Sequence, residues 1–252
     1  MTERIQKYLA HLGLGSRREI ENWIKDGRIF VDGSVASPGI KVNSKSSILF
    51  DGRYIPSVDS QLSSPRLIMY HKRVREICSR KDPKNRNSVF DHLPKLDIGR
   101  WISVGRLDFN TTGLLLFTND GVIANSLMHP RFGLEREYLC RVHGSVSTNK
   151  LNQLRSGVLL DGHLCRFKRF YERPSPGVNY WYGVVVEEGR YREIRRMWSS
   201  IGCTVNRLIR IRYGSIVLPV DLKSGSSRDL DISSIPELAL LNEEDLRKGE
   251  SI

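Results

Sequence analysis

The stretch Gly105–Gly121 reads GRLDFNTTGLLLFTNDG, and the second part of the fold is built outward from it. Its short apolar run, Gly113–Thr118, follows turn-forming residues and predicts a buried strand. Asp108 precedes this strand in a loop that also holds Arg106, so a carboxylate and a guanidinium lie close together. Loops on a rigid scaffold often carry catalytic groups. Asp108 and Asn110 are also common turn formers, and the loop alone leaves both interpretations open.

Strand and helix patterns alternate on both sides of this stretch. Residues 67–70 predict a strand before it. After it, helices are predicted around residues 121–128, 151–155 and 192–201, and strands at 138–142, 182–187, 208–213 and 216–218. We therefore expect an α+β fold, and these patterns alone indicate a mixed sheet with flanking helices.

The first 55 or so residues predict a separate small unit. Apolar residues at helical spacing end at Gly13, and Ser16 stands three residues before Glu19, which is the pattern of a capping box. A second helix is expected up to Gly27, followed by two short β runs around Asp32-Gly33, which predict a hairpin. Three basic residues of this unit, which are candidates for contact with a polyanion, lie on the second helix: Arg17, Arg18 and Lys25.

Composition sets the expected domain boundaries. The Ser-rich stretch Ser57–Ser64 predicts a linker, and the residues after Pro236 are acidic and polar. We expect an N-terminal domain over 1–60, a second domain over 65–236 and a C-terminal tail over 237–252.

The net charge favours a polyanionic partner. The chain has 40 Lys and Arg against 28 Asp and Glu, a formal charge of +12, and 39% hydrophobic residues, which is enough for a core. Lys and Arg that neutralise phosphates release bound counterions, so a basic protein of this kind is typical of nucleic-acid binding.

The four cysteines form no C-x-x-C pair, and none lies at zinc-binding spacing from a histidine. The charged N-terminus and the lack of a long apolar run predict a cytoplasmic protein without a membrane segment. A monomer is the default expectation.

Two arginine-rich segments are candidate RNA contacts. In Gly189–Met197 (GRYREIRRM), helical spacing brings three arginines to one face: Arg192, Arg195 and Arg196. In Arg207–Gly214 (RLIRIRYG), strand alternation predicts one face with Leu208 and two more arginines, Arg210 and Arg212. Solvated basic surfaces remain the alternative for both segments. Tyr138, in LEREYLCRV (134–142), is a candidate for stacking on a base, although a strand tyrosine is more often core.

Together these motifs identify a resemblance. GRLD…TGLLLFTNDG, REY and EGRYREIRRM resemble the RsuA/RluB family of bacterial pseudouridine synthases over about nine-tenths of the chain. CSRKDP (78–83), VFDHLPKL (89–96) and RWISVG (100–105) look most like its RluB branch, which modifies large-subunit (23S) ribosomal RNA. The resemblance implies an N-terminal S-four-type RNA-binding domain and a catalytic domain with a mixed, largely antiparallel sheet. It also implies that ribosomal RNA is the partner.

The resemblance also implies residue roles. Asp108 matches the catalytic aspartate, Arg195 the basic residue that pairs with it, and Tyr138 the tyrosine that stacks on the target base. Arg106 matches the residue that fills the gap left by the flipped base, and Leu208 or Ile194 the apolar wall of the uracil pocket. One departure is at His71–Glu76 (HKRVRE), where the family usually has Lys-Pro-x-Gly. This puts the local turn in question.

The implied reaction is an isomerisation, so no cofactor and no metal are expected. Two other functions remain open. A non-catalytic RNA-binding or ribosome-assembly factor accounts for the charge but leaves the Asp108 loop unexplained. A metal-dependent nuclease needs converging carboxylates, for which Asp120, Glu187 and Glu188 are available without a ligand-type spacing.

Overall fold

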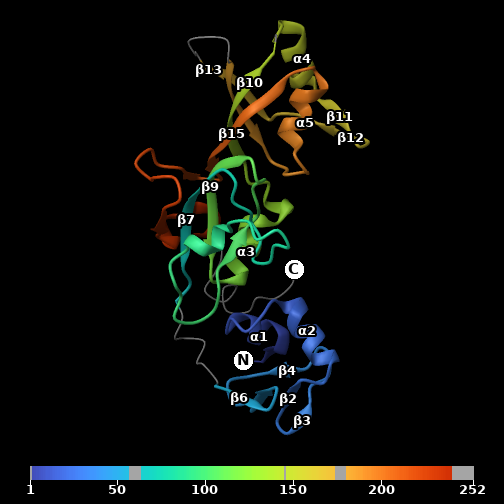
Figure 1. The fold of residues 1–252 in the computed structure, drawn as a ribbon, viewed down its shortest axis with the longest axis vertical. Helices are drawn as coiled ribbons and strands as arrows, with labels where there is room; N and C mark the ends of the chain where they lie inside the picture. The colour runs from blue at the N-terminus through green and yellow to red at the C-terminus, as the bar shows by residue number, and fades with distance from the viewer. Residues whose placement is uncertain (1, 57–63, 145, 174–179, 240–252) are drawn as a thin grey trace. The chain divides into compact units, whose positions relative to one another are not determined.

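The computed structural model describes residues 2–56, 64–144, 146–173 and 180–239. The chain forms two compact units (Figure 1). The first comprises Met1–Arg66, Lys95–Ile102 and Asn119–Gly121, and the second Leu67–Pro94, Ser103–Thr118 and Val122–Ile252. Residues 57–63 of the expected linker and 240–252 of the expected tail lie outside the described residues. No helix in the described ranges has the length and apolar character needed to cross a membrane.

The first unit has the predicted order of helix, helix and hairpin. The capping box at α2 is present, with the Ser16 hydroxyl 3.1 Å from the Glu19 N–H and the Glu19 carboxylate 2.9 Å from the Ser16 N–H. Asp32 and Gly33 both have positive φ, as the predicted hairpin turn requires. Its elements are β1 (Glu3–Arg4), α1 (Ile5–His11), α2 (Arg17–Lys25), β2 (Ile29–Val31), β3 (Ser34–Val35), β4 (Lys41–Val42), β5 (Ile48–Phe50) and β6 (Arg53–Ile55).

The second unit is built on a nine-stranded sheet. Its main order is β13-β14-β10-β15-β9-β7-β17, with β16 paired to β15 and β8 to β9. Along the main order and for β16, every described pairing is antiparallel except the parallel β15–β9 pairing, so the prediction of a mixed, largely antiparallel sheet is confirmed. Its strands are β7 (Leu67–Lys72), β8 (Ile102–Val104), β9 (Thr111–Thr118), β10 (Arg136–His143), β13 (Arg169–Arg173), β14 (Tyr180–Val186), β15 (Thr204–Tyr213), β16 (Ile216–Val217) and β17 (Ser227–Leu230).

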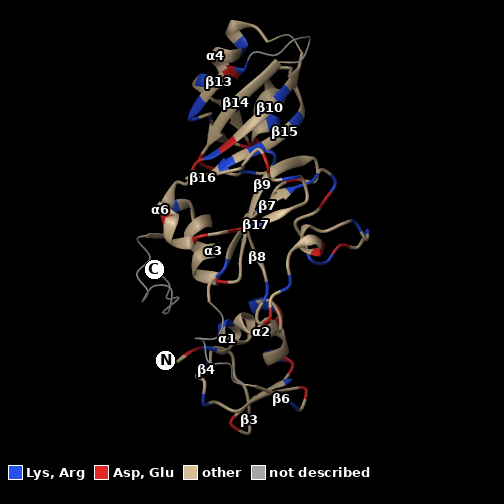
Figure 2. Cartoon of the chain, turned by 90° about the vertical axis from the view of Figure 1, so that its left-hand side faces the viewer, with Lys and Arg blue, Asp and Glu red and all other residues tan. Residues whose placement is uncertain are grey.

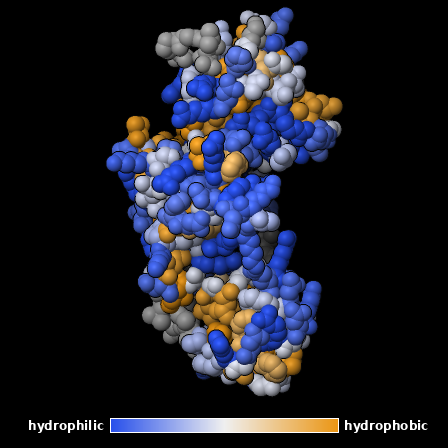
Figure 3. Space-filling view, in the orientation of Figure 1, coloured by the Kyte–Doolittle hydropathy of each residue, from blue (hydrophilic) through white to orange (hydrophobic). Residues whose placement is uncertain are grey.

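Helices and one extra hairpin accompany this sheet. α5 contacts β15 and the hairpin of β11 and β12 (Figure 1). These elements are α3 (Gly121–Met128), α4 (Thr148–Ser156), β11 (Val158–Leu160), β12 (His163–Cys165), α5 (Glu193–Ser200) and α6 (Pro236–Ala239), with 3-10 turns η1 (Val89–His92), η2 (Pro130–Phe132) and η3 (Ile232–Ser234). The hairpin exposes Leu159 and Leu164, which form an apolar patch over β11 and β12 in Figure 3.

The parallel contact between β9 and β15 depends on Gly113. Gly113 has φ +102° and lies opposite Arg210. A Cβ atom at Gly113 would come within 2.2 Å of the Arg210 carbonyl oxygen, so a side chain there would push the two strands apart. This close approach places the end of the Asp108 loop directly beside β15.

The C-terminal tail was expected to begin at residue 237, but the folded second unit extends beyond that residue. Leu238 on α6 is 4% exposed, and the Glu237 carboxylate accepts a hydrogen bond from the Ser215 hydroxyl at 2.6 Å. The residues at 237–239 are therefore part of the folded second unit, because an apolar side chain in this otherwise polar segment packs into the core.

Candidate active site

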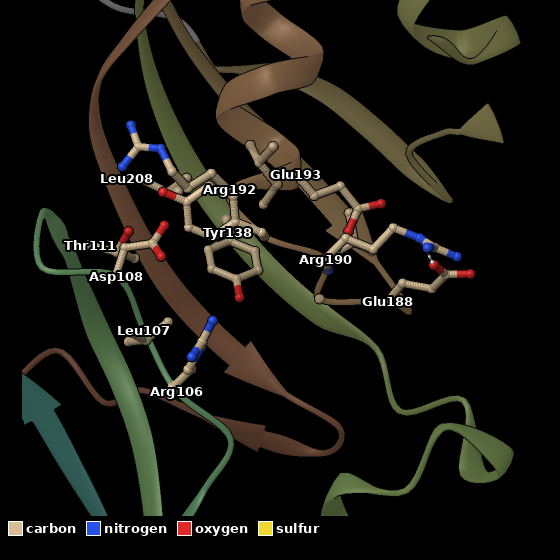
Figure 4. Close-up of a pocket in the computed structure, with 14 residues that line it drawn as sticks. Arg106, Leu107, Asp108, Thr111, Tyr138, Glu188, Arg190, Arg192, Glu193 and Leu208 are labelled. Atoms are coloured by element: carbon tan, nitrogen blue, oxygen red, sulfur yellow. Dashed lines mark hydrogen bonds and ion pairs between the residues drawn. The ribbon is translucent and has the colours of Figure 1, made fainter. Parts of the chain in front are cut away.

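A hollow in the second unit brings together residues that are far apart in the sequence (Figure 4). Arg106–Asp108 and Thr111 come from the loop before β9 and the first residue of that strand. Tyr138 comes from β10, Leu208 from β15, and Glu188–Ile194 from the segment that leads into α5. Most of the residues that the motif analysis singled out in these stretches therefore line one site.

Asp108 lies in the loop before β9, and its side chain is open to this hollow. Its main-chain carbonyl accepts the Thr111 N–H at 3.0 Å, which closes a tight turn into β9. Within the described part of the chain, the carboxylate has no hydrogen bond and no ion pair within 4.0 Å. Figure 4 shows it facing the same space as the Tyr138 ring. The carboxylate is therefore available to a ligand.

The segment after β7 fixes the main chain on both sides of Asp108. The Cys78 thiol donates to the Leu107 carbonyl at 3.3 Å, and its sulfur accepts the Leu107 N–H at 3.4 Å. The Arg75 N–H donates to the Phe109 carbonyl at 2.9 Å. Because Leu107 and Phe109 flank Asp108, these contacts set the direction of its side chain.

Lys72 supports the end of the same loop from β7. Its side chain is fully buried, and its ammonium donates to the carbonyl oxygens of Thr111 and Arg73, both at 2.9 Å. Burial lowers the pKa of Lys72, and the acidic groups around it oppose that shift. Neither Lys72 nor Cys78 was predicted as a site residue. A lysine inside an apolar strand is the signal that could have found the first of them.

The turn that lacks Pro and Gly is formed by other means. Arg75 adopts φ +66°, a conformation that favours glycine. Glu76 is 2% exposed, and its carboxylate accepts the Arg73 N–H at 3.0 Å and the Tyr70 hydroxyl at 2.9 Å. A buried glutamate therefore closes this turn, and Arg75 takes the strained position.

Arg195 contacts the Asp108 loop, but not as an ion pair. Its guanidinium donates to the carbonyl of Asn110 at 2.9 Å and to that of Val205 at 2.6 Å. No ion pair within 4.0 Å joins Arg195 to Asp108 in the described residues, so the expected direct pairing is wrong for this structure. The physical reason is that Arg195 is held by the two main-chain carbonyls of Val205 and Asn110, which direct its terminal nitrogens to the backbone rather than to the Asp108 carboxylate. Burial and then the neighbouring Arg192 lower the pKa of Arg195, and Asp108 opposes this shift.

The inner wall of the hollow is apolar and aromatic. Tyr138, Ile194 and Leu208 all line it, and their exposed fractions are 8%, 6% and 5%. Tyr138 and Leu208 share a face of the sheet, because Leu208 lies opposite Cys140, two residues after Tyr138 on β10. The structure therefore places these three residues together, as the base-pocket prediction requires.

The outer rim of the hollow is cationic. Arg106 and Arg192 both line it, and Figure 4 shows the Arg106 guanidinium pointing toward the hydroxyl end of Tyr138. Arg192 is the N-cap residue of α5 and has φ +48°. Arg190 is paired with the Glu188 carboxylate at 2.6 Å. Arg106 and Arg192 therefore bring two guanidinium groups to the rim of the hollow, and such groups suit the binding of phosphate oxygens.

Arg196 has another partner. It forms a two-point ion pair with Asp161, with N–O distances of 2.7 and 2.8 Å. Asp161 lies in the turn between β11 and β12, so this pair fastens the hairpin to α5. The expectation that Arg196 contacts RNA is not supported, because its guanidinium is already engaged.

The predicted common face of Leu208, Arg210 and Arg212 is wrong. Arg210 lies opposite Tyr138 and Arg212 opposite Glu137, because the register shifts by one residue at this point. This bulge turns Arg212 to the other face of the sheet. Arg210 stays on the Leu208 face but is only 2% exposed, and it donates to the Leu114 carbonyl at 2.7 Å.

On that other face, Arg212 is held by two carboxylates. It contacts Glu137 at 2.8 Å and Glu135 at 2.9 Å. Figure 2 shows basic and acidic residues interleaved around β10, β13 and β15. Neither Arg210 nor Arg212 is therefore a free phosphate ligand, and both stabilise the sheet.

The N-terminal candidates lie on one exposed helix. Arg17, Arg18 and Lys25 on α2 are all exposed. The structure leaves their RNA-binding role a prediction. For the nuclease alternative, no group of three or more His, Cys, Asp or Glu in the described residues is arranged to hold a metal ion, so Asp120, Glu187 and Glu188 form no such cluster there.

Comparison with known proteins identifies the class. A family model described as RNA pseudouridylate synthase matches residues 66–200, and a model of the S4 domain matches residues 3–48. A crystal structure of a pseudouridylate synthase, 25% identical in sequence, superposes with a TM-score of 0.64 over 93% of this chain and 99% of that one. The chain belongs to the RNA pseudouridylate synthase family, and the resemblance found in its motifs is confirmed.

Similar proteins from several bacteria share one name, ribosomal large subunit pseudouridine synthase B. The ribosomal large subunit pseudouridine synthase B of Pseudomonas aeruginosa PAO1 is 47% identical over 243 residues, which are 96% of this chain and 62% of that protein. The protein of that name in Escherichia coli K12 is 48% identical over 235 residues, which are 92% of this chain and 81% of that protein. The chain thus spans somewhat less than two thirds of the length of the first relative.

Proposed function

We propose that this protein converts a specific uridine of large-subunit ribosomal RNA into pseudouridine, with Asp108 as the catalytic carboxylate. The observation that carries the proposal is the Asp108 carboxylate itself, which faces a hollow walled by Tyr138, Leu208 and Ile194. The large-subunit substrate is inferred from the names of the relatives. Residues 1–60 serve as the RNA-binding domain, and the catalytic domain runs from residue 65 and includes residues 237–239. The protein acts as a monomer in the cytoplasm, where ribosomal RNA matures.

The reaction breaks the bond between ribose C1′ and uracil N1, turns the base, and joins C1′ to C5. The C5 hydrogen leaves as a proton, and N1 gains one. The target base must first leave its stack, which costs a few kcal/mol. The ring of Tyr138 can stack on the base and the wall of Leu208 and Ile194 can exclude water, while Arg106 and Arg192 bind the adjoining phosphates.

Asp108 acts as an anion in this site, as nucleophile or as base. Arg195 positions it through the Asn110 carbonyl and supplies a nearby positive charge. Lys72, Cys78 and Arg75 hold the surrounding main chain. Arg17, Arg18 and Lys25 on α2 are placed to bind RNA phosphates outside the catalytic hollow.

The substrate is tested with unmodified transcripts of each ribosomal RNA, labelled with tritium at uridine C5. The wild-type protein should release tritium from large-subunit RNA, up to one equivalent per molecule, and not from small-subunit RNA. Release from small-subunit RNA alone would overturn the assignment. If naked transcripts are inactive, immature large subunits from cells without the enzyme are assayed next. Inactivity on both would favour the assembly-factor function.

A further inference from the structure

We propose that Tyr191 forms a second nucleotide subsite, in which its ring stacks on a base adjacent to the target uridine. This inference rests on the proposed function. Tyr191 lines the same hollow as Asp108 and Tyr138, but it is 67% exposed, whereas Tyr138 is 8% exposed. The two tyrosines therefore occupy different depths of one site.

The Tyr191 ring is not used in the hydrogen bonding or aromatic packing of the described residues. An exposed aromatic ring at the edge of a nucleic-acid site offers a face on which a base can stack. Arg106 and Arg192 line the same hollow and make the surroundings cationic, which suits a nucleic acid rather than an apolar peptide.

The turn that carries Tyr191 is held in place from both sides. The Arg190 carbonyl accepts the Glu193 N–H at 3.2 Å, and the Glu193 carboxylate accepts the Arg190 N–H at 3.2 Å. Glu193 is 7% exposed at the start of α5. The ring is therefore carried by a fixed turn, so the backbone loses little conformational freedom when a base stacks on it.

The chemistry of the substrate requires such a surface. A flipped uridine stays joined by phosphodiesters to its two neighbours, which lose a stacking partner when it leaves. Stacking of a base on an aromatic side chain is sequence-tolerant and strong enough to change affinity about fivefold or more. Tyr138 is taken by the target base, so Tyr191 is the ring at this site that a neighbouring base can use.

The test compares Tyr191→Ala and Tyr191→Phe with Tyr180→Ala, which removes an exposed tyrosine that does not line the hollow. Single-turnover tritium release from large-subunit transcript is measured against enzyme concentration. Tyr191→Ala should raise the half-saturating concentration at least fivefold with an unchanged maximal rate. Tyr191→Phe and Tyr180→Ala should behave as wild type. Unchanged half-saturation in Tyr191→Ala, or an equal loss in Tyr191→Phe, would overturn stacking.

A second measurement identifies the stacked nucleotide. A short RNA stem-loop around the mapped target is made with an abasic residue at one neighbouring position or the other. At one position, the abasic RNA should weaken wild type as much as Tyr191→Ala does, and should not weaken Tyr191→Ala further. Additive losses at both positions would refute the subsite. Inactive wild-type protein on intact RNA would instead count against the proposed function.

Discussion

Arg195 joins two carbonyl groups from different parts of the second unit, Val205 on β15 and Asn110 in the Asp108 loop. A lysine has one compact ammonium and cannot reproduce this planar, two-ended contact. A hydrogen bond to a charged group contributes about 1.5–3 kcal/mol. We expect Arg195→Lys to lower the single-turnover rate of tritium release at least tenfold, with half-saturation by RNA within twofold of wild type.

The matched control for this variant is Arg196→Lys, on the same helix. Arg196 pairs with the exposed Asp161 and does not touch the Asp108 loop. Its rate should remain close to wild type. A normal rate in Arg195→Lys, or equal losses in both variants, would contradict the positioning role of Arg195.

Glu193 makes stability depend on pH. Burial, to which Glu188 adds, raises its pKa above the ordinary value of 4.5. Below about pH 4.5 both the folded and the unfolded chain hold this proton, so the burial has no cost there. As pH rises from about 4.5 through the folded-state pKa, the unfolded chain loses this proton before the folded chain does, so stability falls. Above that pKa the cost is constant.

A glutamine at position 193 removes this ionisation and keeps an oxygen for the Arg190 N–H. Glu193→Gln should therefore raise Tm relative to wild type at pH 7.5, with a smaller difference near pH 4. Thermal denaturation without RNA at the two pH values checks this. The same Tm difference at both pH values would show that the buried carboxylate has no such effect.

The sequence predicted the position of some site residues but not of others. Asp108, Arg106, Tyr138 and Leu208 meet at one site as the motif match implied. The side of the sheet on which Arg212 lies could not be predicted. A one-residue bulge in β15 reverses the alternation, and a bulge depends on pairing with β10 rather than on local sequence.

At the scale of elements, the turn after β7 carries the clearest strain. Arg75 has φ +66°, which costs a residue with a side chain about 1 kcal/mol relative to glycine. Arg75→Gly should therefore raise the free energy of unfolding by up to about 1 kcal/mol in urea denaturation. Its main-chain N–H to Phe109 is kept, so activity should not fall.

The control is Val74→Gly. Val74 is also exposed but is not among the residues with positive φ. Glycine there gains no relief of strain and should lower stability slightly. If Arg75→Gly were as destabilising as Val74→Gly, the strain assigned to Arg75 would be refuted.

Elements were predictable where local signals were strong. The α2 capping box, the Asp32-Gly33 hairpin and the apolar strand β9 all follow from neighbouring residues. The short strands β4, β6, β11, β12 and β17 were not predicted. Their two to four residues carry mixed polar and apolar side chains. β4 and β17 are strands because partners distant in the sequence pair with them, whereas β6, β11 and β12 belong to short local hairpins.

At the scale of the whole molecule, periodicity predicted a mixed sheet with flanking helices, and the resemblance added that the sheet is largely antiparallel. The parallel contact of β9 with β15 joins segments that are far apart in the sequence, and it depends on Gly113. No local sequence pattern predicts a pairing between such distant segments. The hollow is built around this contact, because Asp108 precedes β9 and Leu208 lies on β15.

The net charge of +12 predicts strongly salt-dependent RNA binding. If six or more phosphates are contacted, affinity should fall about a thousandfold or more between 50 and 200 mM salt. Filter binding of the Asp108→Asn variant to large-subunit transcript measures this without turnover. A fall of less than tenfold would show that charge contributes little to binding.

The most direct test of the catalytic role of Asp108 compares wild type, Asp108→Asn and Asp221→Asn in tritium release from C5-labelled large-subunit transcript. Asp221 is an exposed carboxylate paired with Arg228, so it controls for the loss of a charge. Wild type and Asp221→Asn should release tritium at similar rates, and Asp108→Asn should stay at background while it still binds RNA. Release by Asp108→Asn at the wild-type rate would contradict the catalytic role of Asp108.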